Sequence, residues 1–95
     1  MSQGHPSKGV RVNLLFFAKS RELAGVSSCS DFPLAADTLS GHQVLGSICD
    51  RWPELLVIRD CVILAHNEQY CEDLSARITL RDGDEIAVIP PIAGG

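Results

Sequence analysis

The stretch VRVNLLFFA, residues 10–18, decides the fold. Its hydrophobic side chains first alternate with polar ones and then run without interruption, which is typical of a β-strand that becomes covered on its second face. Successive side chains of a strand point to opposite sides. The two faces are Val10, Val12, Leu14 and Phe16 on one side, and Arg11, Asn13, Leu15 and Phe17 on the other. The sequence therefore predicts a first strand with an apolar core face and a second face that is apolar only in its last half.

A second strand of this kind is expected near the other end of the chain, over residues 85–89. The triplet DGD at 82–84 is typical of a tight turn, and Pro90 and Pro91 cannot donate hydrogen bonds to a sheet ladder. The strand should therefore begin after the turn and end before the prolines. We expect it to pair in parallel with the first strand at the centre of a mixed sheet.

The segment between these strands begins with a short helical turn over residues 19–25, which Gly25 is placed to end in a left-handed conformation. Residues 26–35 then predict a second strand. Pro33 lies within it, and a proline has no N–H for a ladder. We therefore expect this strand at an edge of the sheet.

The main helix is predicted from a hydrophobic stripe at helical spacing. Its members are Leu45, Ile48, Cys49 and Trp52. Ser40 and Gln43 match a capping box at its start, and Pro53 prevents its extension beyond Trp52. This helix should pack with one face on the core.

Residues 61–71, CVILAHNEQYC, indicate a hairpin with HNEQ as its turn. One long helix and a mixed sheet pack most economically as an α+β roll, with the helix across one sheet face. Residues 1–9 contain almost no apolar side chain and are expected to form a flexible arm. Residues 10–95 form the single domain that a chain of 95 residues allows.

Composition limits the classes of function. The net charge is −4, which argues against nucleic-acid binding, because that depends on Lys and Arg neutralising phosphates. The longest apolar runs are far shorter than the roughly 20 residues that span a bilayer, so no membrane segment is expected. The chain is 45% hydrophobic and should fold as an ordinary globular domain.

No catalytic or metal motif stands out among the reactive side chains. The cysteines, at positions 29, 49, 61 and 71, form no CxxC pair, and apolar surroundings of Cys49 and Cys61 favour free thiols in a cytosolic protein. His42 and His66 are expected to be a solvated and a turn residue. The carboxylates of the 82–85 segment suit a turn better than a cation site. The chain is therefore not expected to catalyse a reaction alone.

The last six residues, PPIAGG, suggest a chemistry of their own. Pro90 and Pro91 should project the chain away from the sheet in extended form. Side chains then shrink through Ala93, Gly94 and Gly95, which would let a carboxylate enter a narrow channel. Such a carboxylate, with a pKa of ~3.5, is a poor acyl donor until it is activated, for example by adenylation with ATP. The plain alternative is a frayed end.

Three stretches carry a family resemblance: LLFFAKSRELAG at 14–25, DRW at 50–52 and, above all, DGDEIAVIPPIAGG at 82–95. They resemble the small subunits of molybdopterin synthases, which are ubiquitin-like, β-grasp sulfur carriers. The resemblance covers roughly residues 10–95 in order. Ala93 stands where many relatives carry Ser or another small residue, and the segment SSCSDFPLAADTLSGHQ matches weakly.

The resemblance implies a role for the tail. An adenylyltransferase related to ubiquitin-activating enzymes would activate Gly95 with ATP, and a sulfur donor would convert it to a thiocarboxylate. The tail would then enter the active site of the large subunit and pass sulfur to cyclic pyranopterin monophosphate, building the molybdopterin dithiolene. The implied assembly is a heterotetramer of two small and two large subunits. Acid–base groups would come from the large subunit, and no cofactor is expected on this chain.

Partner contacts are expected on the apolar half of the outer sheet face and along the tail. Leu15 and Phe17 share alternation parity with the side of the last strand that bears Ala87 and Ile89. The alternative is a core packed on both faces of the sheet. With the resemblance, we expect a docking surface for the large subunit and the activating enzyme. Its expected members are Leu15, Phe17, Ile89, Pro90, Pro91, Ile92 and Ala93, with Gly94 and Gly95 as the reactive end.

Three other classes share features of this tail. A ubiquitin-like protein modifier would join Gly95 to a lysine amine of a target. Sulfur carriers of thiamin synthesis or tRNA thiolation also end in diglycine. A binding module that makes no use of its carboxylate is the remaining alternative. The paired prolines of PPIAGG resemble the molybdopterin branch and place that function first.

Overall fold

The computed structural model describes residues 8–91, so the predicted arm falls mostly outside the described residues. The strands are β1 (Val10–Phe16), β2 (Ser28–Leu34), β3 (Thr38–Ser40), β4 (Ile63–His66), β5 (Gln69–Tyr70), β6 (Arg77–Thr79) and β7 (Glu85–Ile89). The helices are α1 (Ala18–Ala24), α2 (Gly41–Arg51) and the 3-10 segment η1 (Pro53–Cys61). Both long predicted strands and the main helix are therefore confirmed.

The main sheet has the strand order β2-β1-β7-β4-β5. β1 and β7 pair in parallel at its centre, with Leu15 opposite Ala87, as predicted. β2 lies at an edge, and Pro33 is in it, which confirms that expectation. A separate two-stranded pair, β3 with β6, was not expected from the sequence.

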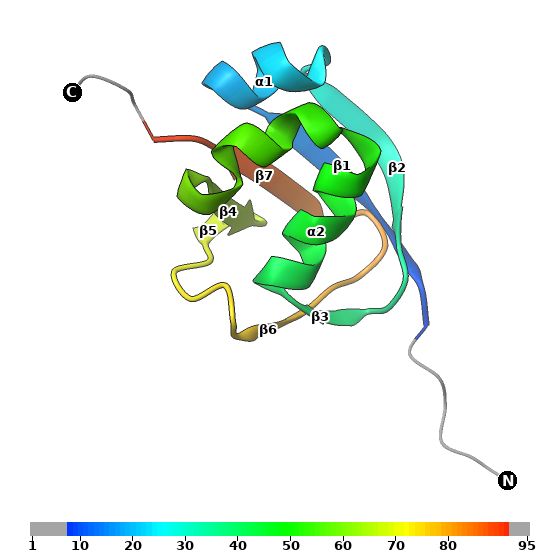
Figure 1. The fold of residues 1–95 in the computed structure, drawn as a ribbon. Coiled ribbons are helices and arrows are strands. Elements are labelled where there is room, and N and C mark those ends of the chain that lie inside the picture. The colour runs from blue at the N-terminus through cyan, green and yellow to red at the C-terminus, as the bar shows by residue number, and fades with distance from the viewer. Residues whose placement is uncertain (1–7, 92–95) are drawn as a thin grey trace, which may run out of the picture.

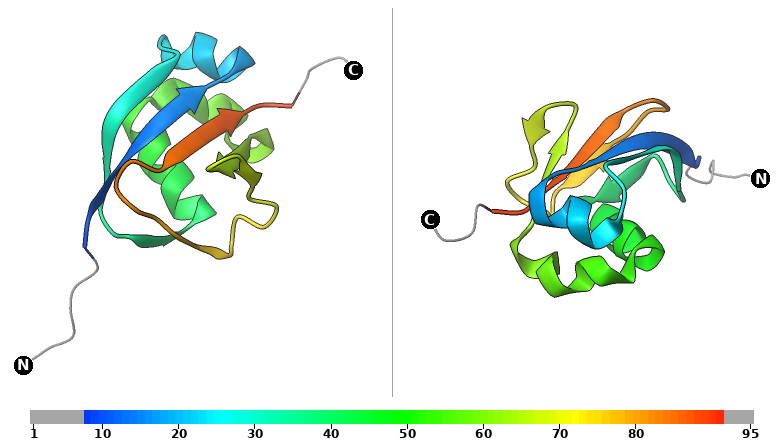
Figure 2. Two further views of the ribbon diagram at one scale, coloured as in Figure 1. Left: turned by 180° about the vertical axis from the view of Figure 1, so that it is seen from behind. Right: turned by 90° about the horizontal axis from the view of Figure 1, so that it is seen from above.

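The helices cover one side of the sheet. In Figure 1, α2 crosses in front of β1 and β7, and the reverse view in Figure 2 shows these strands with no helix before them. The Ser40 hydroxyl accepts a hydrogen bond from the backbone N–H of Gln43 at 3.1 Å, and the Gln43 side chain accepts one from the N–H of Ser40 at 2.8 Å. This capping box confirms the predicted start of α2.

Both α-helices end where the sequence predicted, but the 3-10 segment η1 was not predicted. Gly25 ends α1 with φ of 79°, in the left-handed region. α2 ends at Arg51, before Pro53, but the chain then forms η1 instead of a loop. The prediction of apolar surroundings was wrong for Cys61, which lies exposed at the end of η1. Cys49 is buried, as expected. All four cysteines are free thiols.

Trp52 links the helix layer to the sheet. The residue is 6% exposed, and its ring packs edge-on against Phe16 with ring centroids 4.9 Å apart. Phe32 of the edge strand stacks on it at 5.7 Å. The residue therefore joins α2 to both β1 and β2.

We expect Trp52→Ala to lower the free energy of unfolding by about 3–5 kcal/mol, because it would leave a large cavity between α2 and the sheet. Urea unfolding followed by circular dichroism measures the loss. The matched control is Arg51→Ala, which removes the guanidinium 4.8 Å from the Trp52 ring centroid and should cost about 1 kcal/mol or less. Equal losses for both variants would show that the indole is not a core element.

The predicted hairpin is present, with β4 and β5 antiparallel. Its turn is shorter than HNEQ, because His66 and Gln69 belong to the strands and only Asn67 and Glu68 connect them. Both connecting residues have positive φ, 49° and 71°. A two-residue turn of this shape matches the twist of the strands but favours glycine in its second position.

We expect Glu68→Gly to raise the free energy of unfolding by about 0.5–1 kcal/mol, because glycine adopts positive φ without steric cost while losing some entropy on folding. The measurement is the urea midpoint. Glu68→Gln is the control, since it removes the charge and keeps the strained backbone. If Gln stabilises the chain as much as Gly does, charge and not backbone strain is the cause.

Candidate functional site: the open sheet face and the root of the tail

The side of the sheet opposite the helices carries a continuous apolar surface, here called the open sheet face. Pairing places its residues next to one another: Leu15 opposite Ala87, Ala87 opposite Ala65, and Ile89 opposite Ile63. Tyr70 lies opposite Ala65 at the edge. The open sheet face consists of Leu15, Phe17, Ile63, Ala65, Tyr70, Ala87 and Ile89. The predicted parity of β1 and β7 is thereby confirmed.

No described residue forms a second layer over this face. Phe17, Ile63 and Tyr70 are 45%, 42% and 68% exposed, which is unusual for large hydrophobic side chains that lie together. The two alanines are buried beneath these larger neighbours. The alternative of a core packed on both sheet faces is therefore wrong for residues 8–91.

Sequence reasoning missed the contribution of the hairpin to this surface. Leu64 points into the core, so Ile63 and Ala65 on either side of it must point outward. That alternation is visible in the sequence. Which neighbour they meet depends on the register of β4 against β7, and the register follows from the strand order, which the sequence does not state.

The open sheet face has an apolar end and an acidic end. A shallow hollow of about 380 Å³ on it is lined at one end by Glu68 and Glu85. Ile89 and Phe17, at the ends of β7 and β1, form the opposite end, where the chain continues into the tail. An interacting protein that fits this face should therefore be apolar near the tail and basic beyond it.

The acidic end is held by hydrogen bonds between two turns. Nε2 of His66 lies 2.7 Å from Oδ2 of Asp84, and the Asn67 side chain accepts a hydrogen bond from the N–H of Glu85 at 2.8 Å. Desolvation raises the pKa of Asp84, but hydrogen bonds from His66, the Arg81 N–H and Asn67 outweigh it and lower that pKa below its ordinary value. His66 is thus a strand residue that anchors the β6–β7 turn.

The predicted tail residues divide at Pro91. β7 ends at Ile89, as expected from the prolines that follow. Pro90 is buried and Pro91 is exposed, so only the second proline offers its ring to an interacting protein. The remaining predicted site residues, Ile92, Ala93, Gly94 and Gly95, lie outside the described residues.

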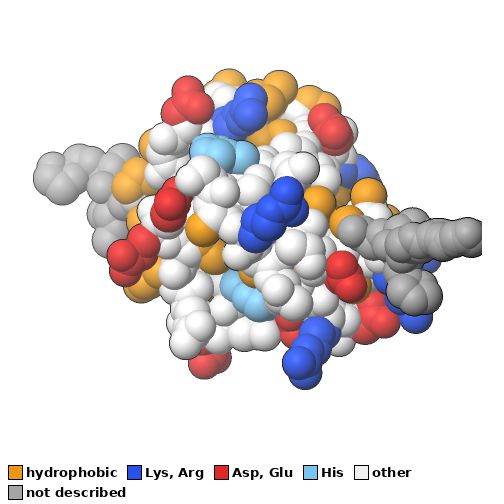
Figure 3. Space-filling model, turned by 90° about the horizontal axis from the view of Figure 1, so that it is seen from below, with side chains coloured by type: hydrophobic (Ala, Val, Ile, Leu, Met, Phe, Trp, Pro, Cys, Tyr) orange, Lys and Arg blue, Asp and Glu red, His pale blue; other side chains and the backbone are white. Residues whose placement is uncertain are grey.

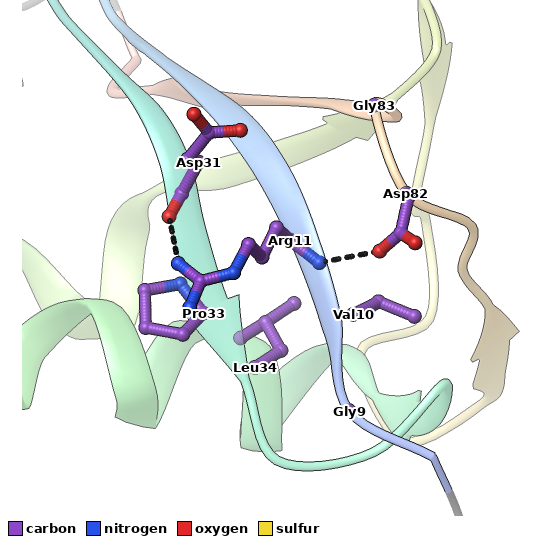
Figure 4. A pocket seen from close by; sticks show the side chains of 8 residues that line it. All are labelled: Gly9, Val10, Arg11, Asp31, Pro33, Leu34, Asp82 and Gly83. Atoms are coloured by element: carbon purple, nitrogen blue, oxygen red, sulfur yellow. Dashed lines mark hydrogen bonds between the residues drawn. The ribbon is translucent and has the colours of Figure 1, made fainter.

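A second hollow on the surface has hydrogen bonds among its own residues. A hollow of about 480 Å³ lies between the start of β1, β2 and the β6–β7 turn (Figure 4). Its polar groups satisfy one another: the Arg11 N–H donates to the Asp82 carboxylate at 2.9 Å, and the Arg11 guanidinium donates to the Asp31 carbonyl at 3.3 Å. These bonds brace the sheet edge, far along the sheet from Ile89.

Neither the charged side chains at one end of the molecule nor the metal-ligating residues of the described chain form a second site. At the end of the molecule that bears β3 and β6, acidic and basic side chains are interspersed (Figure 3). Residues 8–91 hold no group of three or more His, Cys, Asp or Glu placed to bind a metal. Within the same range, every helix is too short or too polar to cross a membrane.

Comparisons with solved structures agree with this fold. A Haloferax volcanii protein superposes with a TM-score of 0.73 at 29% identity, covering 99% of this chain and 94% of that one. The small archaeal modifier protein 1 of Methanosarcina acetivorans gives 0.68 at 28%, covering 97% and 100%. Subunit 1 in a complex with subunit 2 of the molybdopterin-converting factor of Helicobacter pylori gives 0.59 at 22%, covering 90% and 100%, and shows the fold alone. The expected ubiquitin-like β-grasp fold is confirmed.

Relatives found by sequence identify the family more closely than the solved structures do. A molybdopterin synthase sulfur carrier subunit from Aedes aegypti is 71% identical, and the alignment covers both chains completely. Another from Anopheles gambiae is 60% identical and covers 90% of this chain and 93% of its own. Residues 14–95 match the ThiS family. The chain therefore belongs to the ThiS family and to the family of molybdopterin synthase sulfur carrier subunits.

Proposed function

We propose that this chain is the sulfur carrier subunit of a molybdopterin synthase and carries sulfur as a thiocarboxylate on Gly95. The observation that supports this most strongly is the 71% identity, over complete chains, to a relative with that name. The tail sequence PPIAGG and the apolar face at its root fit the same role.

The chemistry requires activation before sulfur transfer. At neutral pH the Gly95 carboxylate is an anion with a pKa of ~3.5 and reacts poorly with nucleophiles. An activating adenylyltransferase transfers AMP from ATP to this carboxylate and releases pyrophosphate. The sulfur donor then delivers hydrosulfide, whose sulfur attacks the acyl carbon, AMP leaves, and the product is the thiocarboxylate. This chain binds no cofactor of its own in that sequence, since ATP is consumed on the activating enzyme.

In the assembled synthase, the large subunit supplies the acid–base groups and this chain supplies the sulfur. The tail enters the active site of the large subunit and passes its sulfur to cyclic pyranopterin monophosphate. Because a dithiolene contains two sulfurs, two carriers are discharged for each molybdopterin. Gly94 allows the backbone to pass a narrow channel, and Pro90 and Pro91 direct the segment away from β7.

The open sheet face is the proposed docking surface for both partners. It adjoins the root of the tail, so a protein that covers it also receives the tail. We propose an assembly of two small and two large subunits. The activating enzyme binds the same face at a different time, because the same carboxylate must reach both active sites. Four free thiols fit the cytosol as the location.

A single-turnover experiment tests the proposal. The Gly95 thiocarboxylate is prepared, mixed with the large subunit and cyclic pyranopterin monophosphate, and quenched at intervals. Molybdopterin and the intact mass of the carrier are then measured. We expect about one dithiolene for every two carriers consumed, with the carrier returning to the mass of the carboxylate. Sulfur that stays on Gly95 would contradict the proposal.

A protein modifier is the second candidate, because the chain is 28% identical to a small archaeal modifier protein with the same fold. The two functions differ in the acceptor of the activated acyl group. In cell extract with ATP, a modifier would be recovered as an isopeptide of Gly95 with a target lysine. The sulfur carrier should instead be recovered with a mass increase of about 16 Da, from exchange of oxygen for sulfur. Isopeptide as the main product would favour the modifier.

A further inference from the structure

Ser20 in α1 is a buried polar side chain whose hydroxyl is fully removed from solvent. Its Oγ donates to the carbonyl of Phe17 at 2.7 Å and lies 3.0 Å from the carbonyl of Val88. It also accepts a hydrogen bond from the N–H of Phe17 at 3.0 Å. One hydroxyl therefore contacts both backbone polar groups of Phe17 and the last buried residue of β7.

These contacts lie where the chain makes an unfavourable reversal. Ala18, between β1 and the rest of α1, has φ of 50°, in the left-handed region that a residue with a Cβ rarely adopts. Phe17 remains extended and turns its ring outward, with the side chain 45% exposed on the open sheet face. The Ser20 hydroxyl comes from the residue two positions after this reversal and binds the N–H and carbonyl of Phe17 just before it, which restricts where the Phe17 ring can lie.

The same hydroxyl reaches the strand that leads to the tail. Val88 is opposite Phe16 in the parallel pair and directly precedes Ile89 and Pro90. The N–H of Phe17 also donates to the Val88 carbonyl, at 3.2 Å. The Val88 carbonyl is therefore contacted by two groups, the backbone N–H of Phe17 and the hydroxyl of Ser20. Both connect Phe17 to the end of β7, where the tail begins.

We propose that Ser20 is a positioning residue for partner docking, and that it acts by holding Phe17 in place relative to the end of β7. This inference rests on the proposed function, in which the open sheet face binds the large subunit. Ser20 is buried and cannot itself contact that protein. Its removal leaves no carbonyl without a donor, because the Phe17 carbonyl still accepts the N–H of Ser20 at 3.1 Å and the Val88 carbonyl still accepts the N–H of Phe17.

A double-mutant cycle separates positioning from general stability. The affinity of the large subunit is measured by calorimetry for wild type, Ser20→Ala, Phe17→Ala and the double variant, at a temperature where all four are folded. We expect Ser20→Ala to weaken binding roughly five- to tenfold, the effect of one lost hydrogen bond. In the Phe17→Ala background, the same change should alter affinity less than about twofold.

The matched control is Ser40→Ala. It also removes a serine hydroxyl that holds the start of a helix, because Ser40 accepts the N–H of Gln43, but it lies in the capping box of α2. It should lower stability by a similar amount without weakening binding. If Ser20→Ala did not fold, the same cycle is run with Ser20→Cys, which keeps a small side chain with a weaker donor.

The outcomes are distinct. An equal loss of affinity on removing Ser20 in both backgrounds would overturn the positioning role, as would a loss with Ser40→Ala as large as with Ser20→Ala. A Phe17→Ala variant that binds normally would overturn both this inference and the docking surface. Failure of the sulfur-carrier function would be seen in a different experiment, the single-turnover assay. There, the wild-type thiocarboxylate would bind the large subunit but yield no molybdopterin.

Discussion

Deleting Gly95 is expected to abolish sulfur transfer to cyclic pyranopterin monophosphate while leaving the fold and the complex with the large subunit intact. The proposed function places the reacting atoms on the backbone of this one residue, so no side chain can replace it. The expected loss is complete within detection. It is measured by single turnover after incubation with ATP, the activating enzyme and a sulfur source.

Two related variants test reach and bulk separately. Appending one residue after Gly95 keeps the glycine but moves the carboxylate beyond its site, so transfer should again be lost. Gly94→Ala should slow activation or transfer, because a methyl group adds bulk and restricts the backbone in a narrow channel. His42→Ala, at an exposed position in the first turn of α2, is the matched control and should keep wild-type turnover. Substantial sulfur transfer by the deletion variant would overturn the role of Gly95.

The central sheet could be predicted because its signals are local and unambiguous. Residues 10–16 alternate and then become fully apolar, which is typical of a central strand with one core face and a second face that is apolar in its last half. Asp82 to Asp84 and the two prolines set the limits of β7 correctly. The Ser40–Gln43 capping box and Pro53 likewise set the limits of α2, since each acts on a backbone hydrogen bond close to it.

Elements that depend on distant contacts could not be predicted in this way. Residues 77–79 and 38–40 are too short to show a period, and they pair because the folded chain brings them together. η1 buries only Leu55, so it has no apolar stripe on one face that the sequence could reveal through a helical period. Cys61 was expected among apolar neighbours because it directly precedes the hydrophobic run 62–65, yet it lies exposed at the end of η1.

The candidate site was predictable in part for the same reason. Leu15, Phe17 and Ile89 followed from alternation within two strands whose pairing could be inferred. Ile63 and Tyr70 required the register of the hairpin against β7, which is a tertiary property. Ser20 carried no signal at all, because a serine in a short helix is ordinarily exposed and only the fold places it beneath Val88.

Phe17→Asp and Ile89→Asp are each expected to weaken binding of the large subunit about a hundredfold or more while leaving circular dichroism unchanged. Both side chains lie on the open sheet face next to the root of the tail, where a docked protein must exclude water. A carboxylate there would be buried without a counter-charge, and hot-spot residues of protein interfaces commonly lose about 2–4 kcal/mol on truncation alone. Phe17 is already 45% exposed in the free chain, so the folded state should tolerate the change.

Val57→Asp is the matched control for these variants, because Val57 is an apolar residue that is 77% exposed on η1, outside the open sheet face. It introduces the same charge into the same chain, so it separates a local effect at the interface from a general effect of one more negative charge. We expect its affinity for the large subunit to be within about twofold of wild type. Calorimetry gives the affinities, and thermal unfolding gives the stability of each variant. If Phe17→Asp and Ile89→Asp fold and bind the large subunit as tightly as Val57→Asp does, then the open sheet face is not the docking surface.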